Sequence, residues 1–421
     1  MGIKRMQITN FKSFNQLELT LDKFNVLIGA NAGGKSNFVQ IFQFIRDISE
    51  YGLDNAISMQ GGIEYLRNIK IGASKNLSFT VASDTDYRGI CFDDKGLIGI
   101  KTYEIIYDFE MGFKKRGHGF DLVKDKLTMK CKFYKLKQKR VKVEEKETIG
   151  EGEIILSHNK KTVSVELNST NESIKSIKTN EFLSRFFKEQ KLNAKVPLIE
   201  KPHIIPMNLF GIVNLFDNIS IYDFDPKLSK QPSRMTGKSE LEESGKNLSI
   251  ILKNILKDKE KKRKFVNLLK DILPFIDDFD VDRFVDKSLL VTLQETYYQD
   301  TNLPASLISD GTVNILALIV ALYFEIKPLT IIEEPERNIH PYLISKIIAM
   351  MKDASNNKQI LITTHNPEIV KNAGLENLLL TSRDKDGFSK IEKPGDKESV
   401  KAFLKNQIGI DELYIQNLLG A

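Results

Sequence analysis

Cysteine and long apolar runs are scarce in this chain of 421 residues. Its two cysteines, Cys91 and Cys131, are too few for a disulfide framework and lack the C-x-x-C spacing of a metal site. No apolar run approaches the roughly 18 residues that a membrane span needs, and residues 313–323 fit a core helix better. The N-terminal apolar stretches are short and interrupted by charge, which argues against a signal peptide. These absences predict a cytoplasmic protein that does not itself bind or span a membrane, and they leave a membrane partner chain open.

The composition fits a packed globular protein. Hydrophobic residues make up 41% and charged residues 28% of the chain, and the length allows two or three domains. The net charge of +6 is mildly basic, and most lysines are expected to solvate the surface. Residues 257–264 fit that description because they mix both signs. Residues 135–143, KLKQKRVKV, alternate basic and apolar residues, so one strand face there is the better candidate for contacts with nucleic-acid phosphates.

Residues 29–36 read GANAGGKS and match the pattern G-x-x-x-x-G-K-[ST]. An apolar strand pattern, residues 24–28, comes before them, and a helical pattern, residues 37–45, follows. The glycines let the backbone wrap a phosphate chain with its N–H groups inward, and the helix dipole adds positive potential. Lys35 would reach the β- and γ-phosphates, and the Ser36 hydroxyl would ligate Mg²⁺. The alternative, a glycine-rich turn before an ordinary helix, is disfavoured by these flanking elements.

A second apolar strand pattern, residues 328–335, ends in two carboxylates. An acid at a strand end beside a phosphate loop can hold Mg²⁺ through water, and its neighbour can deprotonate the attacking water. We therefore predict that Glu333 serves the metal and Glu334 the water. Alone, an acidic strand exit is commonly a surface feature, and the phosphate loop makes the catalytic interpretation the better one.

Two further segments point to the same chemistry. Residues 309–312, SDGT, precede a long apolar helical run, and helix capping alone would explain them. Residues 359–367, QILITTHNP, predict a buried strand that ends at His365. A histidine at that position can hydrogen-bond a γ-phosphate, although an isolated histidine is usually structural.

This order of motifs resembles the ATP-binding-cassette (ABC) type of ATPase, and most closely its branch of SMC, RecF and OLD proteins. Residues 6–14, MQITNFKSF, are similar to the first strand of that branch, and residues 334–341, EPERNIHP, match its E-P-E-x-x-x-H-P run. The resemblance covers approximately residues 1–80 and 200–421. It implies an α/β fold: a P-loop ABC-type ATPase head with a mixed sheet and with inserted antiparallel β-rich and helical segments.

The resemblance also implies a composite site for ATP and Mg²⁺. Ser309 and Gly311 would contact the γ-phosphate of a nucleotide held by the opposite subunit, so the chain would act as a homodimer or a larger homo-oligomer. Glu334 and His365 would be catalytic, and Ser36 and Glu333 would hold the metal. The residues that bind nucleotide within one chain would be Gly29, Asn31, Gly33, Gly34, Lys35, Ser36 and Asn37.

The chain also keeps one further feature of the family pattern and departs from others. Glu336 and Asn338 would lie in the loop that crosses the dimer interface. The metal acid is Glu333 where the wider family usually has Asp, and Asn314 stands where the branch often has Arg. No convincing glutamine matches the usual glutamine loop.

The motif spacing predicts four segments. An N-terminal ATPase lobe with the phosphate loop covers residues 1–95, and a β-rich insertion covers 96–184. A helical segment covers 185–280, and a C-terminal ATPase lobe with signature, paired acids and switch histidine covers 281–421. No heptad run of SMC length is present.

The short stretch after His365 leaves no room for the nuclease domain that OLD proteins append, and the five scattered histidines form no H-N-H constellation. The chain looks like the stand-alone ATPase subunits of bacterial anti-phage systems such as Septu and PARIS, which pair with a nuclease or toxin. The resemblance thus implies an ATPase that controls a separate effector. The alternative is a RecF-like ATPase that binds DNA in repair or clamping. A module that holds ATP without turnover is less expected because Glu334 is present.

Overall fold

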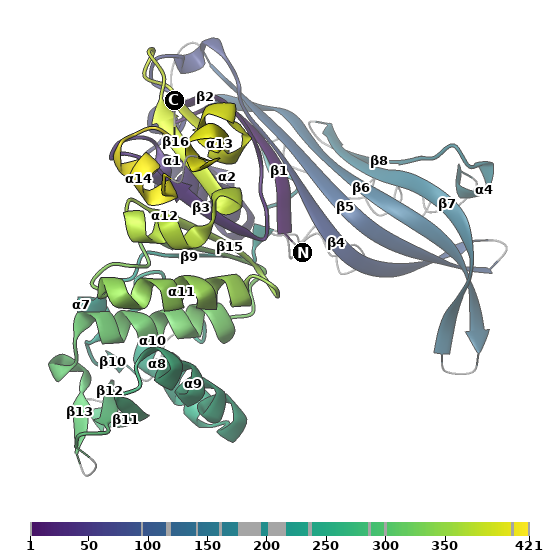
Figure 1. The fold of residues 1–421 in the computed structure, drawn as a ribbon. Coiled ribbons are helices and arrows are strands. Elements are labelled where there is room, and N and C mark those ends of the chain that lie inside the picture. The colour runs from purple at the N-terminus through teal and green to yellow at the C-terminus, as the bar shows by residue number, and fades with distance from the viewer. Residues whose placement is uncertain are drawn as a thin grey trace. The chain divides into compact units, whose positions relative to one another are not determined.

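The computed structural model describes residues 2–93, 96–114, 119–139, 142–159, 162–175, 195–200, 216–234, 238–284, 288–298, 301–405 and 408–419. The chain forms two compact units, each built from separate stretches of sequence (Figure 1). Unit 1 consists of Met1–Leu21, Ser36–Ile219 and Arg383–Ile391, and unit 2 of Asp22–Lys35, Ser220–Ser382 and Glu392–Ala421.

Unit 1 is built on a seven-stranded antiparallel sheet with the order β2-β1-β4-β5-β6-β7-β8. The long middle strands run side by side in Figure 1. Their sequences alternate, so that in β5 the buried Ile105, Tyr107 and Phe109 face the core while the residues between them are more exposed. The strands are β1 (Gly2–Phe11), β2 (Phe14–Thr20), β4 (Leu77–Asp93), β5 (Gly96–Phe113), β6 (Phe120–Lys139), β7 (Lys142–Asn159) and β8 (Thr162–Asn168).

Helix α1 (Lys35–Tyr51) packs its aromatic face into the core of unit 1. The ring of Phe44 lies 5.9 Å from that of Phe11 and 6.4 Å from that of Phe79, measured between centroids. Phe79 in turn stacks on Phe109 at 4.7 Å. The smaller helices of this unit are α2 (Leu53–Met59), α3 (Ile63–Leu66), η1 (Gly72–Ser74) and α4 (Glu172–Lys175).

Unit 2 contains the sheet β16-β3-β15-β14-β9. Pairing is parallel between β14 and β15, between β15 and β3, and between β16 and β3. Parallel strands are covered on both faces, which explains why their sequences read as continuous apolar runs. The strands are β3 (Phe24–Ile28), β9 (Ile219–Tyr222), β14 (Leu329–Glu333), β15 (Gln359–Thr364) and β16 (Leu378–Arg383), and β17 (Ser389–Glu392) follows in the chain.

The register of this sheet places three predicted motifs at one edge. Glu333 is aligned with Thr363, and Thr364 with Ile28. The phosphate loop after β3, the paired acids after β14 and the histidine after β15 therefore all leave the carboxyl ends of neighbouring strands. In open parallel sheets this edge is where ligands bind.

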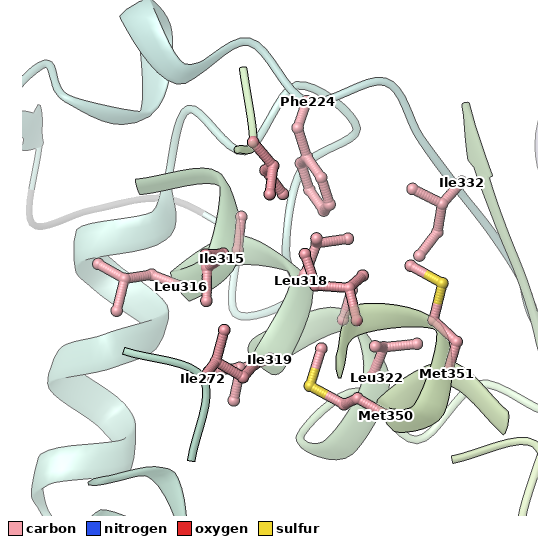
Figure 2. Close-up of a cluster of buried hydrophobic side chains, with 14 of the residues drawn as sticks. Phe224, Ile272, Ile315, Leu316, Leu318, Ile319, Leu322, Ile332, Met350 and Met351 are labelled. Atoms are coloured by element: carbon pink, nitrogen blue, oxygen red, sulfur yellow. The ribbon is translucent and has the colours of Figure 1, made fainter. Parts of the chain in front are cut away.

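The core of unit 2 surrounds α10 (Asp310–Tyr323), in which every residue from Thr312 to Leu322 is buried. Figure 2 shows Leu318 and Leu322 among Met350 and Met351 of α11 (Pro341–Ala354) and Ile332 of β14. The prediction of a core helix here is confirmed. Among the described residues, no helix is long and apolar enough to cross a membrane.

The remaining elements of unit 2 are short. A small antiparallel sheet joins β10 (Ser233–Arg234), β12 (Ser288–Glu295), β11 (Ile276–Phe284) and β13 (Asn302–Pro304). The other helices are α7 (Pro226–Ser229), α8 (Leu248–Leu256), α9 (Lys259–Ile272), η4 (Ala305–Leu307), α12 (Pro367–Ala373), η5 (Leu375–Asn377), η6 (Pro394–Asp396), α13 (Glu398–Lys405) and α14 (Ile410–Ile415).

The four segments predicted from the sequence remain a prediction, and parts of them, residues 176–194 and 201–215, lie outside the described residues. The basic stretch 135–143 is described only in part, because the side chains of residues 137–143 lie outside the description. Lys135 itself contacts Glu147 at 2.9 Å, and Lys132 and Lys130 of the same strand contact Glu151 and Glu104. Lys130, Lys132 and Lys135 of β6 are therefore paired with carboxylates on neighbouring strands.

Candidate functional site

The phosphate loop owes its shape to glycine. Gly29 has φ +149°, and a Cβ there would lie 2.4 Å from the carbonyl oxygen of Thr381 in β16. Any other residue would therefore push the loop off the sheet. The Thr381 hydroxyl also donates to the carbonyl of Gly33 at 2.9 Å. Contacts between the backbone of the loop and Thr381 therefore hold the loop in this shape.

The lysine of the loop is folded against it. Lys35 Nζ donates to the carbonyls of Gly29 at 2.7 Å and Ala30 at 3.3 Å. Burial lowers the pKa of Lys35, and the nearby Glu334 and Glu336 carboxylates oppose this shift. Burial is the larger effect, and the two carboxylates offset part of it. The ammonium is in position to exchange these carbonyls for phosphate oxygens.

The remaining predicted nucleotide-binding residues lie around this loop. Asn31 and Ser36 are exposed, and Gly33 and Gly34 are buried. In unit 1, Asn37 Nδ2 donates to Ser13 Oγ at 2.8 Å.

Asn37 also lines a groove of about 550 Å³ within unit 1. Four cations and one carboxylate, Asp386, line the groove, and this excess of positive charge can attract an anionic ligand. The buried Asn10 and Asn68 hold its walls, since Asn68 N donates to Asn10 Oδ1 at 3.0 Å and Asn68 Nδ2 donates to the Lys12 carbonyl at 2.7 Å. The cations are Lys12, Arg67, Lys70 and Arg383.

Glu333, the last residue of β14, lies close to several other carboxylates. Burial, together with the charges of Asp223, Glu243 and Glu334, raises the pKa of Glu333 to about 7, while Arg337 acts in the opposite direction. A divalent cation would relieve this repulsion, and carboxylate oxygens are the ligands that Mg²⁺ prefers. In the described part of the chain, no three acidic, histidine or cysteine side chains form a metal cage.

The second acid contacts the predicted switch histidine. Glu334 Oε1 lies 3.0 Å from His365 Nδ1, and Glu334 Oε2 accepts a hydrogen bond from Arg337 at 3.2 Å. Glu334 has φ +44°, a conformation that costs free energy in a residue other than glycine. Its backbone N–H donates to the Thr363 carbonyl at 2.9 Å, which holds it in this position. The structure thus brings together two residues that are 31 positions apart.

The signature residues begin α10. Ser309 is its N-cap, and Ser309 Oγ accepts from the Thr312 N–H at 3.1 Å. Capping therefore accounts for the serine within one chain, and its role toward a second nucleotide stays a prediction. Gly311 is required for packing, because a Cβ there would lie 2.4 Å from the carbonyl oxygen of Asn338. Asp310 forms an ion pair with Lys230.

Two residues of this region have their side chains buried within the chain. Asn314, in the position where Arg is common, is buried, and its Nδ2 donates to the carbonyls of Pro335 at 3.2 Å and Arg337 at 2.8 Å. Glu336 has its side chain turned inward at 9% exposure, where it accepts from the Thr364 hydroxyl, whereas Asn338 is exposed.

Sequence reasoning missed two contributors to the site. Asp223 follows the short strand β9 and accepts from Arg337 at 2.8 Å. Tyr414 of α14 donates to the Gly29 carbonyl at 3.5 Å. Neither Asp223 nor Tyr414 stands in a sequence motif that would have pointed to the site.

The family model described as "AAA domain, putative AbiEii toxin, Type IV TA system" matches residues 24–371. The chain belongs to this family of AAA domains. The match contains the phosphate loop, the signature, both acids and His365, which makes the chain an ATPase-family protein. No curated protein matches it.

Solved structures similar to this AAA-domain chain are heads of SMC proteins. The SmcHead bound to the C-winged helix domain of ScpA is 15% identical with a TM-score of 0.50, over 93% of this chain and 98% of that one. The SMC head domain from Thermotoga maritima is 12% identical, with a TM-score of 0.40 and coverage of 93% and 99%. The Pyrococcus furiosus Smc head domain, with an extended coiled coil and bound to the C-terminal domain of ScpA, is 13% identical, with a TM-score of 0.46 and coverage of 96% and 99%.

The first of these similarities shows the fold. The chain has an SMC-head-like P-loop ATPase fold of the α/β class, with parallel and antiparallel sheets, and the predicted fold class is confirmed. The finer placement beside the ATPase subunits of Septu or PARIS systems goes beyond these matches.

Proposed function

We propose that this chain binds and hydrolyses ATP at composite sites shared by two copies and thereby controls a partner protein. The observation that carries the proposal is the meeting of the phosphate loop, Glu333, Glu334 and His365 at one edge of the parallel sheet. Three motifs that are spread over more than three hundred residues of the chain lie at this edge, and this supports a role in phosphoryl transfer to water.

The residues of this edge divide the work. Lys35 exchanges the carbonyls of Gly29 and Ala30 for the β- and γ-phosphates, and the loop N–H groups bind the phosphate oxygens. Glu334 orients the attacking water and takes its proton, and His365 donates to the γ-phosphate. Ser36 and Glu333 would hold Mg²⁺, which supplies charge neutralisation at the phosphates when bound.

A second copy would complete the site. Ser309 and Gly311 lie at the N-terminus of α10, whose N–H groups and dipole favour an anion. In the proposed dimer these residues contact the γ-phosphate held by the opposite chain. Gly311 also packs against the Asn338 carbonyl, so the signature and the loop after the acids form one surface within unit 2.

A mixing experiment tests the composite site. Ser309→Arg should abolish hydrolysis although the phosphate loop of the same chain is intact, and Lys35→Ala should abolish it by removing the phosphate cation. A mixed dimer of the two variants has one site with both lesions and one with neither. We expect partial recovery of ATP hydrolysis in the mixture. A normal rate in the Ser309→Arg homodimer, or no recovery despite verified heterodimers, would contradict the shared site.

The controlled partner is proposed to be a separately encoded nuclease or toxin in anti-phage defence. Two comparisons support a partner: the family description refers to a toxin–antitoxin system, and the similar SmcHead is bound to a domain of another protein. A pull-down of the native complex followed by mass spectrometry tests this. Recovery of a nuclease or toxin supports the proposal, and recovery of the ATPase alone contradicts it.

A RecF-like DNA-binding ATPase is the second candidate. The basic groove of unit 1 favours it, because phosphate backbones bind where cations gather. The paired lysines of β6 do not, since their charge is already neutralised. Stimulation of ATP hydrolysis by DNA, with a stimulation that falls steeply as salt is raised, would favour this candidate over the effector model.

A further inference from the structure

A buried chain of hydrogen bonds runs from the signature helix to the turn that carries His365. Asn314 Nδ2, on α10, donates to the Pro335 and Arg337 carbonyls and so grips the backbone on both sides of Glu336. Asn314 is 2% exposed and Glu336 9% exposed, which shields these bonds from water. Such bonds fix geometry better than exposed ones, because water cannot replace the lost partner.

The chain continues through the carboxyl group of Glu336. Its Oε1 accepts from the hydroxyl of Thr364, the last residue of β15. Thr364 Oγ1 in turn accepts from the Asn366 N–H at 2.9 Å, and Asn366 caps α12 through the Glu368 N–H. One hydroxyl therefore spans His365 from both sides, since its partners are Glu336 and the residue that follows the histidine.

The position of the His365 side chain depends on the backbone turn that carries it. His365 has a side chain 57% exposed, and its described contact is the one with Glu334 at 3.0 Å. An exposed ring with one such contact takes its position from the backbone that carries it. The hydroxyl of Thr364 and the carboxyl of Glu336 set that backbone.

We infer that Glu336, with Asn314 and Thr364, is a positioning residue that holds His365 against Glu334 and links the signature helix to this pair. The inference rests on the proposed function, because it assigns a role within the same site. It adds a role within one chain to the sequence expectation that Glu336 belongs to the loop that crosses the dimer interface. It also gives Asn314 a use of its own in place of the common arginine.

The test uses Thr364→Val, which removes the hydroxyl and keeps the shape. The matched control is Thr330→Val in the neighbouring strand β14, because Thr330 is equally buried at 0% exposure and its hydroxyl has no partner among the described residues. We expect kcat for ATP to fall roughly 10-fold in Thr364→Val with KM changed less than about twofold, since a displaced group near the chemistry slows the reaction without weakening binding. Thr330→Val should keep the wild-type rate.

Variants of Glu336 separate position from charge. Glu336→Gln keeps an oxygen to accept from Thr364, and it breaks no hydrogen bond at Oε2, which has no partner in the described part of the chain. It should retain kcat within about threefold, whereas Glu336→Ala should lose roughly 10-fold. The double variant Glu336→Ala/Thr364→Val should be no slower than Thr364→Val alone, because Thr364→Val already breaks the bond that Glu336→Ala removes.

Three outcomes would overturn the inference in an active enzyme. These are a Thr364→Val rate equal to that of Thr330→Val, a Glu336→Gln rate as low as that of Glu336→Ala, and additive losses in the double variant. Asn314→Asp, which cannot donate to two carbonyls, should lower kcat in the same way if it folds, as judged by circular dichroism. An inactive wild-type chain would instead contradict the proposed function, so the two failures are distinguishable.

Discussion

The antiparallel sheet of unit 1 and the parallel-sheet edge of unit 2 treat charge in opposite ways. In the antiparallel sheet, lysines face carboxylates on the next strand, as in the Lys130–Glu104 pair at 2.6 Å and the Lys124–Asp108 pair at 3.3 Å. At the parallel edge, Glu333, Glu334 and Asp223 crowd together with Arg337 as the compensating cation.

This difference indicates which charged residues are placed to bind a ligand and which only pair with each other. Cross-strand pairs satisfy each charge locally and contribute little beyond solubility and register. A crowd of like charges costs stability and is retained where a cation or a proton is to be bound. Both regions are rich in charged residues, so composition alone would not distinguish them.

The largest effect, on ATP binding, is expected when a lysine of the phosphate loop is compared with a lysine that is paired across strands. Lys35→Ala removes the mobile cation of the phosphate loop, and we expect it to abolish ATP binding. Lys130→Ala removes a paired cation and should leave binding unchanged. Equilibrium titration with a fluorescent ATP analogue measures both variants. Wild-type affinity in Lys35→Ala would contradict the assignment of residues 29–36 as a phosphate-binding loop.

The corresponding comparison between two carboxylates concerns ATP hydrolysis. Glu334→Gln should retain ATP binding and slow turnover by ~10²-fold or more, the scale of losing a positioned base. Glu104→Gln, in the antiparallel sheet, should turn over at the wild-type rate. Steady-state phosphate release decides between them. If Glu334→Gln is fully active, the base must be another group, with Glu333 the nearest candidate.

A smaller effect concerns pH and stability. The pKa of Glu333 is raised from 4.5 to about 7, so its folded carboxyl takes up a proton more readily than in the unfolded chain. That contribution to stability is present below pH 4.5 and is lost as pH rises through 7. Glu333→Gln should therefore lose less stability than the wild type between pH 5 and pH 8, by about 1–2 kcal/mol.

Urea unfolding in the absence of Mg²⁺ and nucleotide measures this difference. Lys124→Gln provides a comparison from the antiparallel sheet and should follow the wild-type pH dependence. Equal pH dependence in Glu333→Gln and wild type would show that the carboxylate crowd does not act on Glu333.

The smallest effect is expected for a cross-strand pair itself. Lys130 and Glu104 have side chains 34% and 25% exposed, so solvent screens their attraction. A double-mutant cycle of Lys130→Gln and Glu104→Gln should give a coupling of about 0.2–1 kcal/mol in urea unfolding. A coupling of several kcal/mol would mean that this sheet also depends on specific charge pairs.

Local pattern was enough to predict the individual motifs of the site. A buried strand, a glycine loop and a helix are written in consecutive residues, and so are the strand before Glu333 and the strand before His365. Because parallel strands end at a common edge, their order in the family pattern also places these motifs together. The sequence by itself thus determined the fold class and the residues of the loop, the acids and the histidine.

Tertiary structure alone decided which way the side chains point. Glu336 turns inward to Thr364, Asn314 grips the carbonyls beside it, and Arg337 reaches Asp223 across more than one hundred positions of the chain. Periodicity assigns a residue to a face of a helix or strand, but loop residues have no such period. Their orientation follows from the packing of α10 and β15 around them, because a buried polar group adopts the position in which its hydrogen bonds are made.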